Sequence, residues 1–254
     1  MTNLSMTTML RSFALAIFGC ALSVGSAFAA DESAGIVSAN TSITNQGSLQ
    51  RGAQLFVNYC SGCHSLRFMR YSRMAEDLGL SEQQVMDNLN FTGAKYGDKM
   101  HATMTAADGT KWFGAPPPDL SLEVRAKGAD WVYSYLRSFY VDPSRPVGWN
   151  NVVFPNASMP NVLWELQGIQ TAAFKPAAEE GADPEFDAFS LQQPGQLSPG
   201  QFDEAARDIT AFLQYVSEPA ALQRHAIGIW VLLYLILFTI LAWFLKHEYW
   251  KDVH

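Results

Sequence analysis

Hydrophobic positions recur with a helical period soon after a polar N-terminal stretch. They follow one another at intervals of four, three, four and three residues: Leu49, Ala53, Phe56, Cys60 and Cys63. Such spacing places side chains on one face of a helix. The sequence therefore predicts a helix that leads into the two cysteines and directs them into the core.

A second helical pattern covers residues 199–216, with Ser198 as its predicted N-cap and Pro199 at the first helical position. Its apolar positions are Phe202, Ala205, Ile209, Phe212 and Val216. Gly52 lies beside the apolar face of the first helix, where a missing side chain would let this last helix approach closely. A tolerated helix glycine is the alternative. We expect the two helices to close one domain.

Shorter helical signals lie between these ends. Ser81 and Gln84 form a capping-box pattern, and Asp130 is a candidate cap for a further helix that Pro143 would terminate. That helix has an aromatic stripe, more typical of plain core than of a cofactor wall: Trp131, Tyr135 and Phe139. No convincing run of alternating strands is present, so we expect a mostly α domain with long loops.

The beginning of the chain is typical of an exported protein. Residues 13–24 are apolar, follow Arg11 and precede small residues, so residues 1–29 are predicted to be a cleaved secretory signal. Lipid modification of Cys20 is the alternative. Residues 30–47 are polar and predict an extended leader with little structure of its own.

The end of the chain predicts a membrane anchor. Residues 226–245 are uncharged and largely apolar, and a helix of about 20 residues spans about 30 Å of hydrocarbon. A buried core helix is the alternative. We expect a domain at 48–218, a short linker at 219–225, one transmembrane helix and a cytoplasmic tail at 246–254.

The motif Cys60-x-x-Cys63-His64 carries the chemistry of the chain. Two cysteines three residues apart can bond both vinyl groups of a haem, and the following histidine can ligate the iron, so the motif predicts one covalently bound haem c. A dithiol pair or part of a zinc site are the alternatives, but zinc takes four ligands and Cys20 is the only other cysteine. Export agrees with haem, because bacteria attach it outside the cytoplasm. The domain should therefore lie in the periplasm, on the inner membrane.

The other face of a haem needs a second ligand. The candidates are Met100, Met104, His101 and Met159. Met159 is favoured because Pro155 and Pro160 stiffen its loop, and a thioether opposite histidine raises the reduction potential. Residues 115–120, which include three prolines, predict a stiff wall beside the haem.

Charge narrows the choice of partners. The net charge of −7 argues against nucleic acid and favours a basic protein partner. One acidic loop is predicted, either as solvated surface or as a docking patch: Glu179, Glu180, Asp183, Glu185 and Asp187.

Nearly the whole chain after the signal resembles the cytochrome c1 family. The motifs that carry the resemblance, in order, are Arg51-Gly52-Ala53-Gln54-Leu55-Phe56, Asn58-Tyr59-Cys60-Ser61-Gly62-Cys63-His64-Ser65, Pro117-Pro118-Asp119-Leu120-Ser121 and Met159-Pro160. The resemblance implies a class I cytochrome c-like haem domain with His64 and Met159 as axial ligands. It also implies that Arg125 lies near a haem propionate, which a guanidinium suits. A surface arginine is the alternative.

The resemblance further implies a function. The chain would be an electron-transfer subunit of the cytochrome bc1 complex, a dimeric multi-subunit membrane assembly, and not an enzyme on its own. It would work beside cytochrome b, accept an electron from a Rieske iron–sulfur protein and pass it to a soluble cytochrome c. Two alternatives stay open: an anchored carrier of another respiratory assembly such as a terminal oxidase, and a haem enzyme or gas sensor, which methionine ligation disfavours.

Overall fold

The computed structural model describes residues 35–176 and 184–252, so the predicted signal and Cys20 lie outside the described residues. Helices make up about half of the described residues. The elements, in chain order, are α2 (Gln46–Tyr59), β1 (Leu66–Arg70), α3 (Tyr71–Leu78), α4 (Glu82–Asn88), β2 (Lys99–Met100), α5 (Ala106–Phe113), α6 (Glu123–Lys127), α7 (Ala129–Arg137), β3 (Phe139–Val141), β4 (Trp149–Asn151), α8 (Trp164–Gln167), β5 (Gly168–Lys175), β6 (Glu185–Pro194), α9 (Pro199–Ser217) and α10 (Ala221–Trp250).

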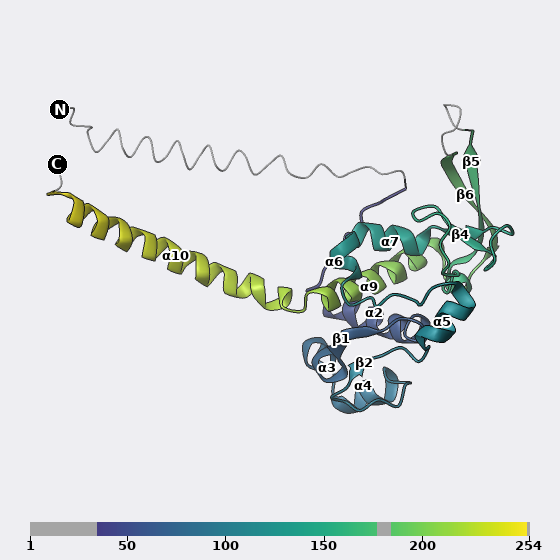
Figure 1. The fold of residues 1–254 in the computed structure, drawn as a ribbon, viewed down its shortest axis with the longest axis horizontal. Coiled ribbons are helices and arrows are strands. Elements are labelled where there is room, and N and C mark those ends of the chain that lie inside the picture. Colours follow the sequence, from purple (N-terminus) through teal and green to yellow (C-terminus); the bar gives the residue numbers. More distant parts are fainter. Residues whose placement is uncertain (1–34, 177–183, 253–254) are drawn as a thin grey trace. The chain divides into compact units, whose positions relative to one another are not determined.

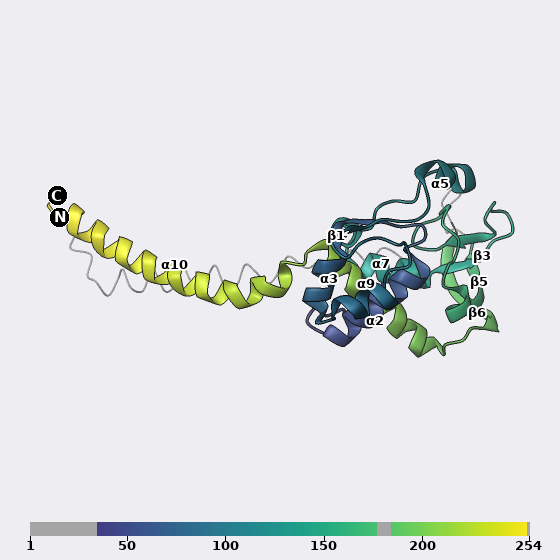
Figure 2. The same cartoon turned by 90° about the horizontal axis from the view of Figure 1, so that it is seen from below.

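Helices α2 and α9 lie side by side in the centre of the domain (Figures 1 and 2). A Cβ atom on Gly52 would lie 2.0 Å from the carbonyl oxygen of Asp208 and 2.7 Å from Cβ of Phe212. No side chain fits in this space, so the predicted packing role of Gly52 is confirmed. Next to it, the rings of Phe56 and Phe212 have their centroids 5.7 Å apart.

A buried carboxylate fastens the same crossing. Asp208 is 3% exposed, and it accepts hydrogen bonds from Ser48 Oγ at 2.5 Å and from Arg51 Nε at 2.6 Å. Breaking such a pair would leave a buried charge without partners, which is strongly unfavourable. The bonds therefore fix one rotation of α2 against α9.

The predicted capping box of α4, formed by Ser81 and Gln84, is confirmed. Helix α9 begins as predicted, with Ser198 as its N-cap and Pro199 at its first position, and Gln201 adds a capping box that was not predicted. These signals lie within one turn of the chain, so they do not depend on distant contacts.

The predicted cap of α7 is wrong. Asp130 lies inside the helix, and Gly128 precedes it as the N-cap. The Asp130 carboxylate instead accepts the N–H of Ala39 at 2.7 Å. The helix also ends at Arg137, before Pro143, because strand β3 follows it.

Besides the expected helices, the described residues form three two-stranded antiparallel sheets: β1–β2, β3–β4 and β5–β6. The longest pairs Gly168 with Pro194 at one end and Lys175 with Glu185 at the other. Nearly every residue of β6 is exposed, so β6 lacks the alternation that predicts a strand. Of the predicted acidic loop, Glu185 and Asp187 belong to β6. The remaining members, Glu179, Glu180 and Asp183, lie outside the described residues.

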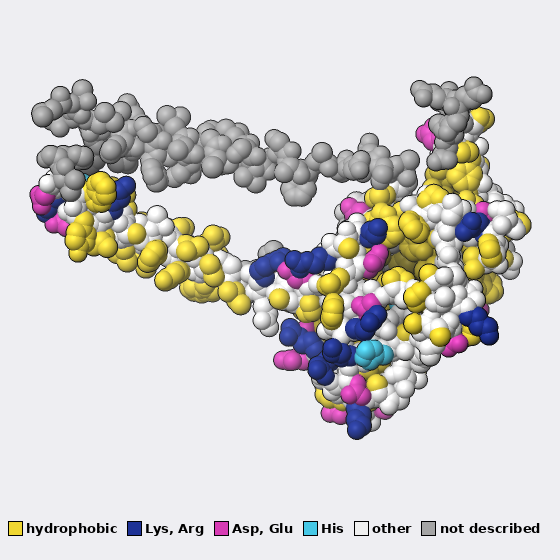
Figure 3. All heavy atoms as spheres, in the orientation of Figure 1, with side chains coloured by type: hydrophobic (Ala, Val, Ile, Leu, Met, Phe, Trp, Pro, Cys, Tyr) yellow, Lys and Arg dark blue, Asp and Glu magenta, His cyan; other side chains and the backbone are white. Residues whose placement is uncertain are grey.

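The apolar C-terminal helix is confirmed. Helix α10 contains the stretch Ile227–Trp250, which is long and apolar enough to cross a membrane, and none of it is buried. Its surface is mainly hydrophobic (Figure 3). Because α10 begins at Ala221, most of the predicted linker at 219–225 is helical.

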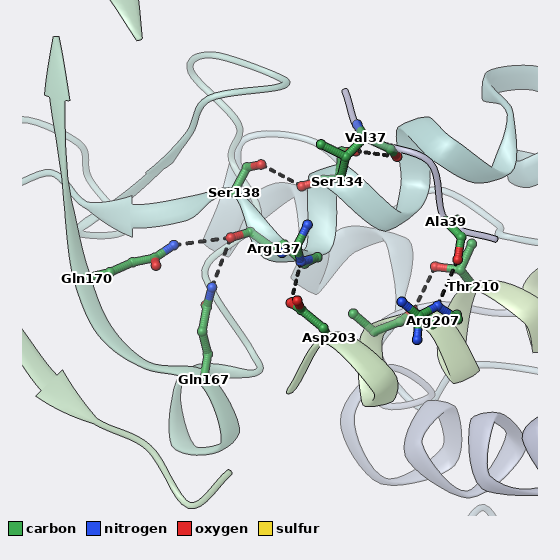
Figure 4. A network of polar contacts seen from close by, with 11 residues as sticks. Val37, Ala39, Ser134, Arg137, Ser138, Gln167, Gln170, Asp203, Arg207 and Thr210 are labelled. Carbon is green, nitrogen blue, oxygen red and sulfur yellow. Dashed lines mark hydrogen bonds and ion pairs between the residues drawn. The ribbon is translucent and has the colours of Figure 1, made fainter. Parts of the chain in front are cut away.

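The described part of the leader has no helix or strand before α2, yet it is packed onto the domain. The N–H of Val37 donates to Ser134 Oγ at 2.9 Å, and Arg207 Nε donates to the carbonyl of Ala39 at 2.8 Å (Figure 4). Ala39 is completely buried. Helices α7 and α9 therefore hold this segment in place.

Candidate functional site

Helix α2 brings the Cys-x-x-Cys-His motif to the wall of a cavity. Cys60 is the C-cap of α2 and is 6% exposed. The chain then turns back on itself, because the N–H groups of Cys63 and His64 donate to the carbonyl of Cys60 at 3.0 and 2.9 Å. The periodicity predicted a helix as far as Cys63, whereas a tight turn brings it there. Cys60, Cys63 and His64 all line the cavity.

The imidazole of His64 is held in one orientation. Its Nδ1 lies 2.8 Å from the carbonyl oxygen of Pro118. A carbonyl only accepts hydrogen bonds, so Nδ1 must carry the proton and Nε2 keeps its lone pair. Burial lowers the pKa of His64, although the bond to Pro118 opposes this shift. The neutral ring can therefore offer Nε2 as a metal ligand.

The proline-rich segment forms a second wall. Pro116, Pro117 and Pro118 line the cavity, as do Ala115 and Leu120. The N–H of Leu120 donates to the carbonyl of Ser65 at 3.0 Å, which ties this wall to the motif. The predicted wall at 115–120 is thus confirmed as part of the cavity.

Met159 lies in the same cavity. Its Sδ atom lies 3.5 Å from the hydroxyl of Tyr135, which donates a hydrogen bond to it. Burial raises the pKa of Tyr135 far above its usual value, so the hydroxyl keeps its proton. The three other candidates for the second ligand, Met100, His101 and Met104, do not line this cavity.

The predicted aromatic stripe is partly a cavity wall, so its interpretation as plain core is wrong for two of its residues. Trp131 and Tyr135 line the cavity, and their rings stack with centroids 5.1 Å apart. Phe139 is 1% exposed and packs edge-on against Tyr135. Only the first two side chains extend from the core to the cavity.

Together these walls enclose a cavity of about 400 Å³ lined mainly by apolar side chains. Two thiols, an imidazole and a thioether are brought together here from the end of α2 and from the loop that holds Met159. This is the donor set of a covalently bound haem with two axial ligands.

The site gives little support to the alternative interpretations of the cysteines, which are a redox dithiol pair and part of a zinc site. Burial raises the pKa of Cys60 to about 12 and also raises that of Cys63. A redox dithiol acts through a thiolate, which a lower pKa favours. Within the described residues, no group of three or more His, Cys, Asp or Glu side chains is arranged to hold a metal ion.

Arg125 does not line the cavity. Its side chain is 64% exposed, and Nη1 lies 3.7 Å from a carboxylate oxygen of Glu218. Its contact with a propionate stays a prediction. Charged side chains that do line the cavity are Glu123 and Lys127, and the ammonium of Lys127 lies 5.4 Å from the centre of the Trp131 ring.

Sequence reasoning missed Tyr135 and Lys127 as cavity residues. Both belong to helical patterns that are common on ordinary surfaces and cores. A signal was available for Tyr135, because it follows Trp131 by one helical turn and both rings could face the same ligand.

Comparisons with known proteins agree with this site. The sequence model of the Cytochrome C1 family matches residues 38–179 and 194–253. A cytochrome c1 of Allochromatium vinosum is 52% identical over 85% of this chain and 89% of its own length. A protein of Nitrosomonas europaea named ammonia monooxygenase gamma subunit is 42% identical over 82% of this chain and 84% of its own length.

A third relative is longer than this chain. The cytochrome b/c1 of Bradyrhizobium diazoefficiens is 26% identical over 83% of this chain, which corresponds to 34% of that protein. The family match covers both the residues around the cavity and the apolar helix α10. The chain therefore belongs to the cytochrome c1 family.

Proposed function

We propose that this chain is the membrane-anchored electron-transfer subunit of a quinol to cytochrome c reductase, and that Cys60, Cys63, His64 and Met159 hold its haem. The cytochrome c1 family carries one covalently attached haem c. The observation that supports these four residues is their shared position in one apolar cavity of about 400 Å³. Cys60 and Cys63 would form the thioether bonds, and His64 and Met159 would be the axial ligands.

The residues of the chain have defined tasks in such a site. The haem supplies one-electron chemistry, because its iron is stable in ferric and ferrous states. Pro118 orients His64, Tyr135 holds the sulfur of Met159, and the apolar walls exclude water. Because His64 and Met159 are held in place, they would need little rearrangement when the charge of the iron changes. If His64 and Met159 both bound the iron, no position would be left for a substrate, which would favour electron transfer over a haem enzyme or gas sensor.

The proposed placement puts the haem domain, residues 48–218, in the periplasm of a bacterial cell. It rests on the signal pattern at 1–29 and on the apolar helix that follows the domain. Lys246 and Lys251 follow the predicted span and would remain on the cytoplasmic side with the tail. Only Glu218, Pro219 and Ala220 separate α9 from α10, so the haem would stay close to the membrane surface.

The proposed partners are cytochrome b, a Rieske iron–sulfur protein as electron donor and a soluble cytochrome c as acceptor, in a dimeric complex. The relative named cytochrome b/c1 supports the link with cytochrome b. A second candidate is an anchored carrier in another assembly. The relative named ammonia monooxygenase gamma subunit is the observation that favours it.

Purification of the intact membrane complex through a tag on this chain separates these two candidates. We expect cytochrome b and a Rieske protein to co-purify, and the preparation to reduce cytochrome c with quinol in a manner blocked by inhibitors of the quinol site. Co-purification with an oxidase alone, without quinol oxidation, would reject the first candidate.

The mode of haem binding is tested separately. Acid acetone extracts haem that is held by ligation alone and leaves thioether-bound haem on the polypeptide. We expect the purified protein to stay red. Addition of carbon monoxide to the reduced protein should leave its spectrum largely unchanged, since Met159 fills the sixth position. Rapid and complete carbon monoxide binding would instead indicate an open iron site.

A further inference from the structure

A second cavity lies on the domain surface, and none of the residues that line it lines the cavity described above. It is an open cleft of about 480 Å³ between β1, β2 and the loop that precedes β2. Three basic side chains line it: Arg70, Lys99 and His101. In Figure 3, Lys and Arg side chains gather over β1, β2 and α3 with a histidine beside them. The cleft is therefore polar and cationic in a chain whose net charge is −7.

The two strongest cations of the cleft face each other across the β1–β2 pair. Arg70 and Lys99 are Cα partners in this antiparallel ladder. Like charges directly opposite in a sheet are destabilising. Arg70 Nη1 also donates to the carbonyl of Gly97, which holds the guanidinium on the side of the cleft. The pairing of the two strands thus places two exposed basic residues at the same cleft.

A helix end adds to the positive potential. Arg70 is also the N-cap of α3, and the first turn of α3 contains no acidic residue. The N-terminus of a helix carries a partial positive charge, which favours anions and disfavours cations nearby. The arginine at this position therefore adds its charge to the positive end of the helix.

Neighbouring carboxylates do not neutralise this pair. Within the described part of the chain, no carboxylate oxygen lies within 4.0 Å of the Arg70 or Lys99 charge, although Arg67 and Arg73 on either side are both paired. Asp98 lines the cleft, but its carboxylate accepts the N–H of Lys95 at 2.8 Å within its own turn. The cations of the cleft are available to an anion from solution.

We propose that this cleft binds a phosphate group, held between the guanidinium of Arg70 and the ammonium of Lys99, with His101 at the rim. A guanidinium fork and an ammonium are the two side-chain groups best suited to phosphate oxygens. The phosphate belongs either to an anionic phospholipid headgroup or to a free phosphate ion. A phosphate that binds only the folded domain stabilises it by mass action. This inference does not depend on the proposed electron-transfer function.

The test uses the full-length haem-loaded chain in detergent and inorganic phosphate as the probe. Phosphate binding is measured by isothermal titration calorimetry and by the midpoint of thermal unfolding. Lys99→Gln removes one charge of the cleft, and Lys95→Gln removes the same charge from a neighbouring turn that does not line it. We expect Lys99→Gln to weaken binding about fivefold or more, as for one lost charge-assisted hydrogen bond, and Lys95→Gln to leave it unchanged.

The source of the phosphate is identified by competition. If short-chain phosphatidylglycerol displaces inorganic phosphate from the wild-type chain and not from Lys99→Gln, the ligand is a lipid headgroup; if it does not compete, the ligand is free phosphate. The proposal is overturned if phosphate neither binds nor raises the unfolding midpoint, or if both variants weaken binding equally. It is also overturned if an acidic peptide binds the cleft and phosphate does not, because the cleft would then be a protein-docking surface.

Discussion

The hydroxyl of Tyr135 donates a hydrogen bond to Sδ of Met159 at 3.5 Å. The two residues come from different parts of the fold, Tyr135 from helix α7 and Met159 from the loop before α8. A donor on the sulfur withdraws electron density that the sulfur would otherwise give to ferric iron. The contact would therefore favour the reduced state of the haem that we propose at Met159.

The first prediction is that Tyr135→Phe lowers the reduction potential. The loss of one hydrogen bond of about 0.5–1.5 kcal/mol corresponds to a decrease on the order of 20–60 mV for a one-electron couple. Spectroelectrochemical titration of the purified protein measures it. Tyr140→Phe is the control, because Tyr140 does not line the cavity and should leave the potential unchanged. An equal shift of the reduction potential in both variants would show that the hydrogen bond from Tyr135 does not tune the potential.

Met159 itself gives the second prediction. Met159→Leu should leave the haem covalently attached through Cys60 and Cys63 and lower the potential far more than Tyr135→Phe does, because the thioether ligand is lost. The reduced protein should also gain the ability to bind carbon monoxide. Met104→Leu is the matched control, since Met104 was a candidate ligand and does not line the cavity. If Met104→Leu lowers the potential and Met159→Leu does not, the ligand is Met104.

Local signals in the sequence predicted much of the fold and the site. The capping box of α4, the N-cap and first-position proline of α9, the apolar stretch of α10 and the Cys-x-x-Cys-His motif are each contained in a short segment, and each is found as expected. These local features depend on neighbours in the sequence, so they can be predicted without the tertiary structure. The close approach at Gly52 was also expected, although its partner Asp208 lies on α9, because a glycine beside an apolar helix face leaves room for a second helix.

The features that were predicted wrongly or missed depend on contacts between residues that are far apart in the sequence. Asp130 looks like a helix cap, but its partner is the N–H of Ala39, 91 residues away in the sequence. The contact between Tyr135 and Met159 and the ladder between Arg70 and Lys99 also join separate elements. Strand β6 is nearly all exposed, so no burial pattern marks it. Contacts of this kind are decided by tertiary packing and leave no periodic signal.

The helix crossing provides the third prediction. Gly52→Ala should lower the free energy of unfolding by about 2–4 kcal/mol, because the new methyl group would collide with the backbone of Asp208 and α9 would have to move. Gly47→Ala in the same helix has its nearest neighbours at 3.7 Å and should stabilise by about 0.5–1 kcal/mol through helix propensity. Urea unfolding of both variants measures the difference. Equal effects would show that close packing at Gly52 is not what requires glycine.

The fourth prediction concerns acid stability and the segment that holds the proline wall. Asp119 accepts hydrogen bonds from the N–H of Ser121 at 3.0 Å and from the N–H of Arg67 at 2.9 Å. Burial alone would raise the pKa of Asp119, but hydrogen bonds from the Ser121 side chain and from these two N–H groups outweigh it, and the pKa is lowered. The folded protein thus releases this proton more readily than the unfolded chain does. The resulting stability is fully present above the unfolded pKa of about 3.9 and is lost as the pH falls through the lower, folded pKa.

Asp119→Asn should therefore destabilise the domain by about 1–2 kcal/mol at pH 7, where the carboxylate and its bonds are intact in the wild type. Below about pH 4 the difference between wild type and variant should shrink, because the wild-type carboxylate also becomes neutral. Urea unfolding at a series of pH values from 7 to about 3 measures this convergence. Asp87→Asn makes the same charge change on the exposed side of α4 and should have little effect at any pH. A difference between wild type and Asp119→Asn that stays constant down to the lowest pH would mean that shape, and not the charge of Asp119, secures the loop.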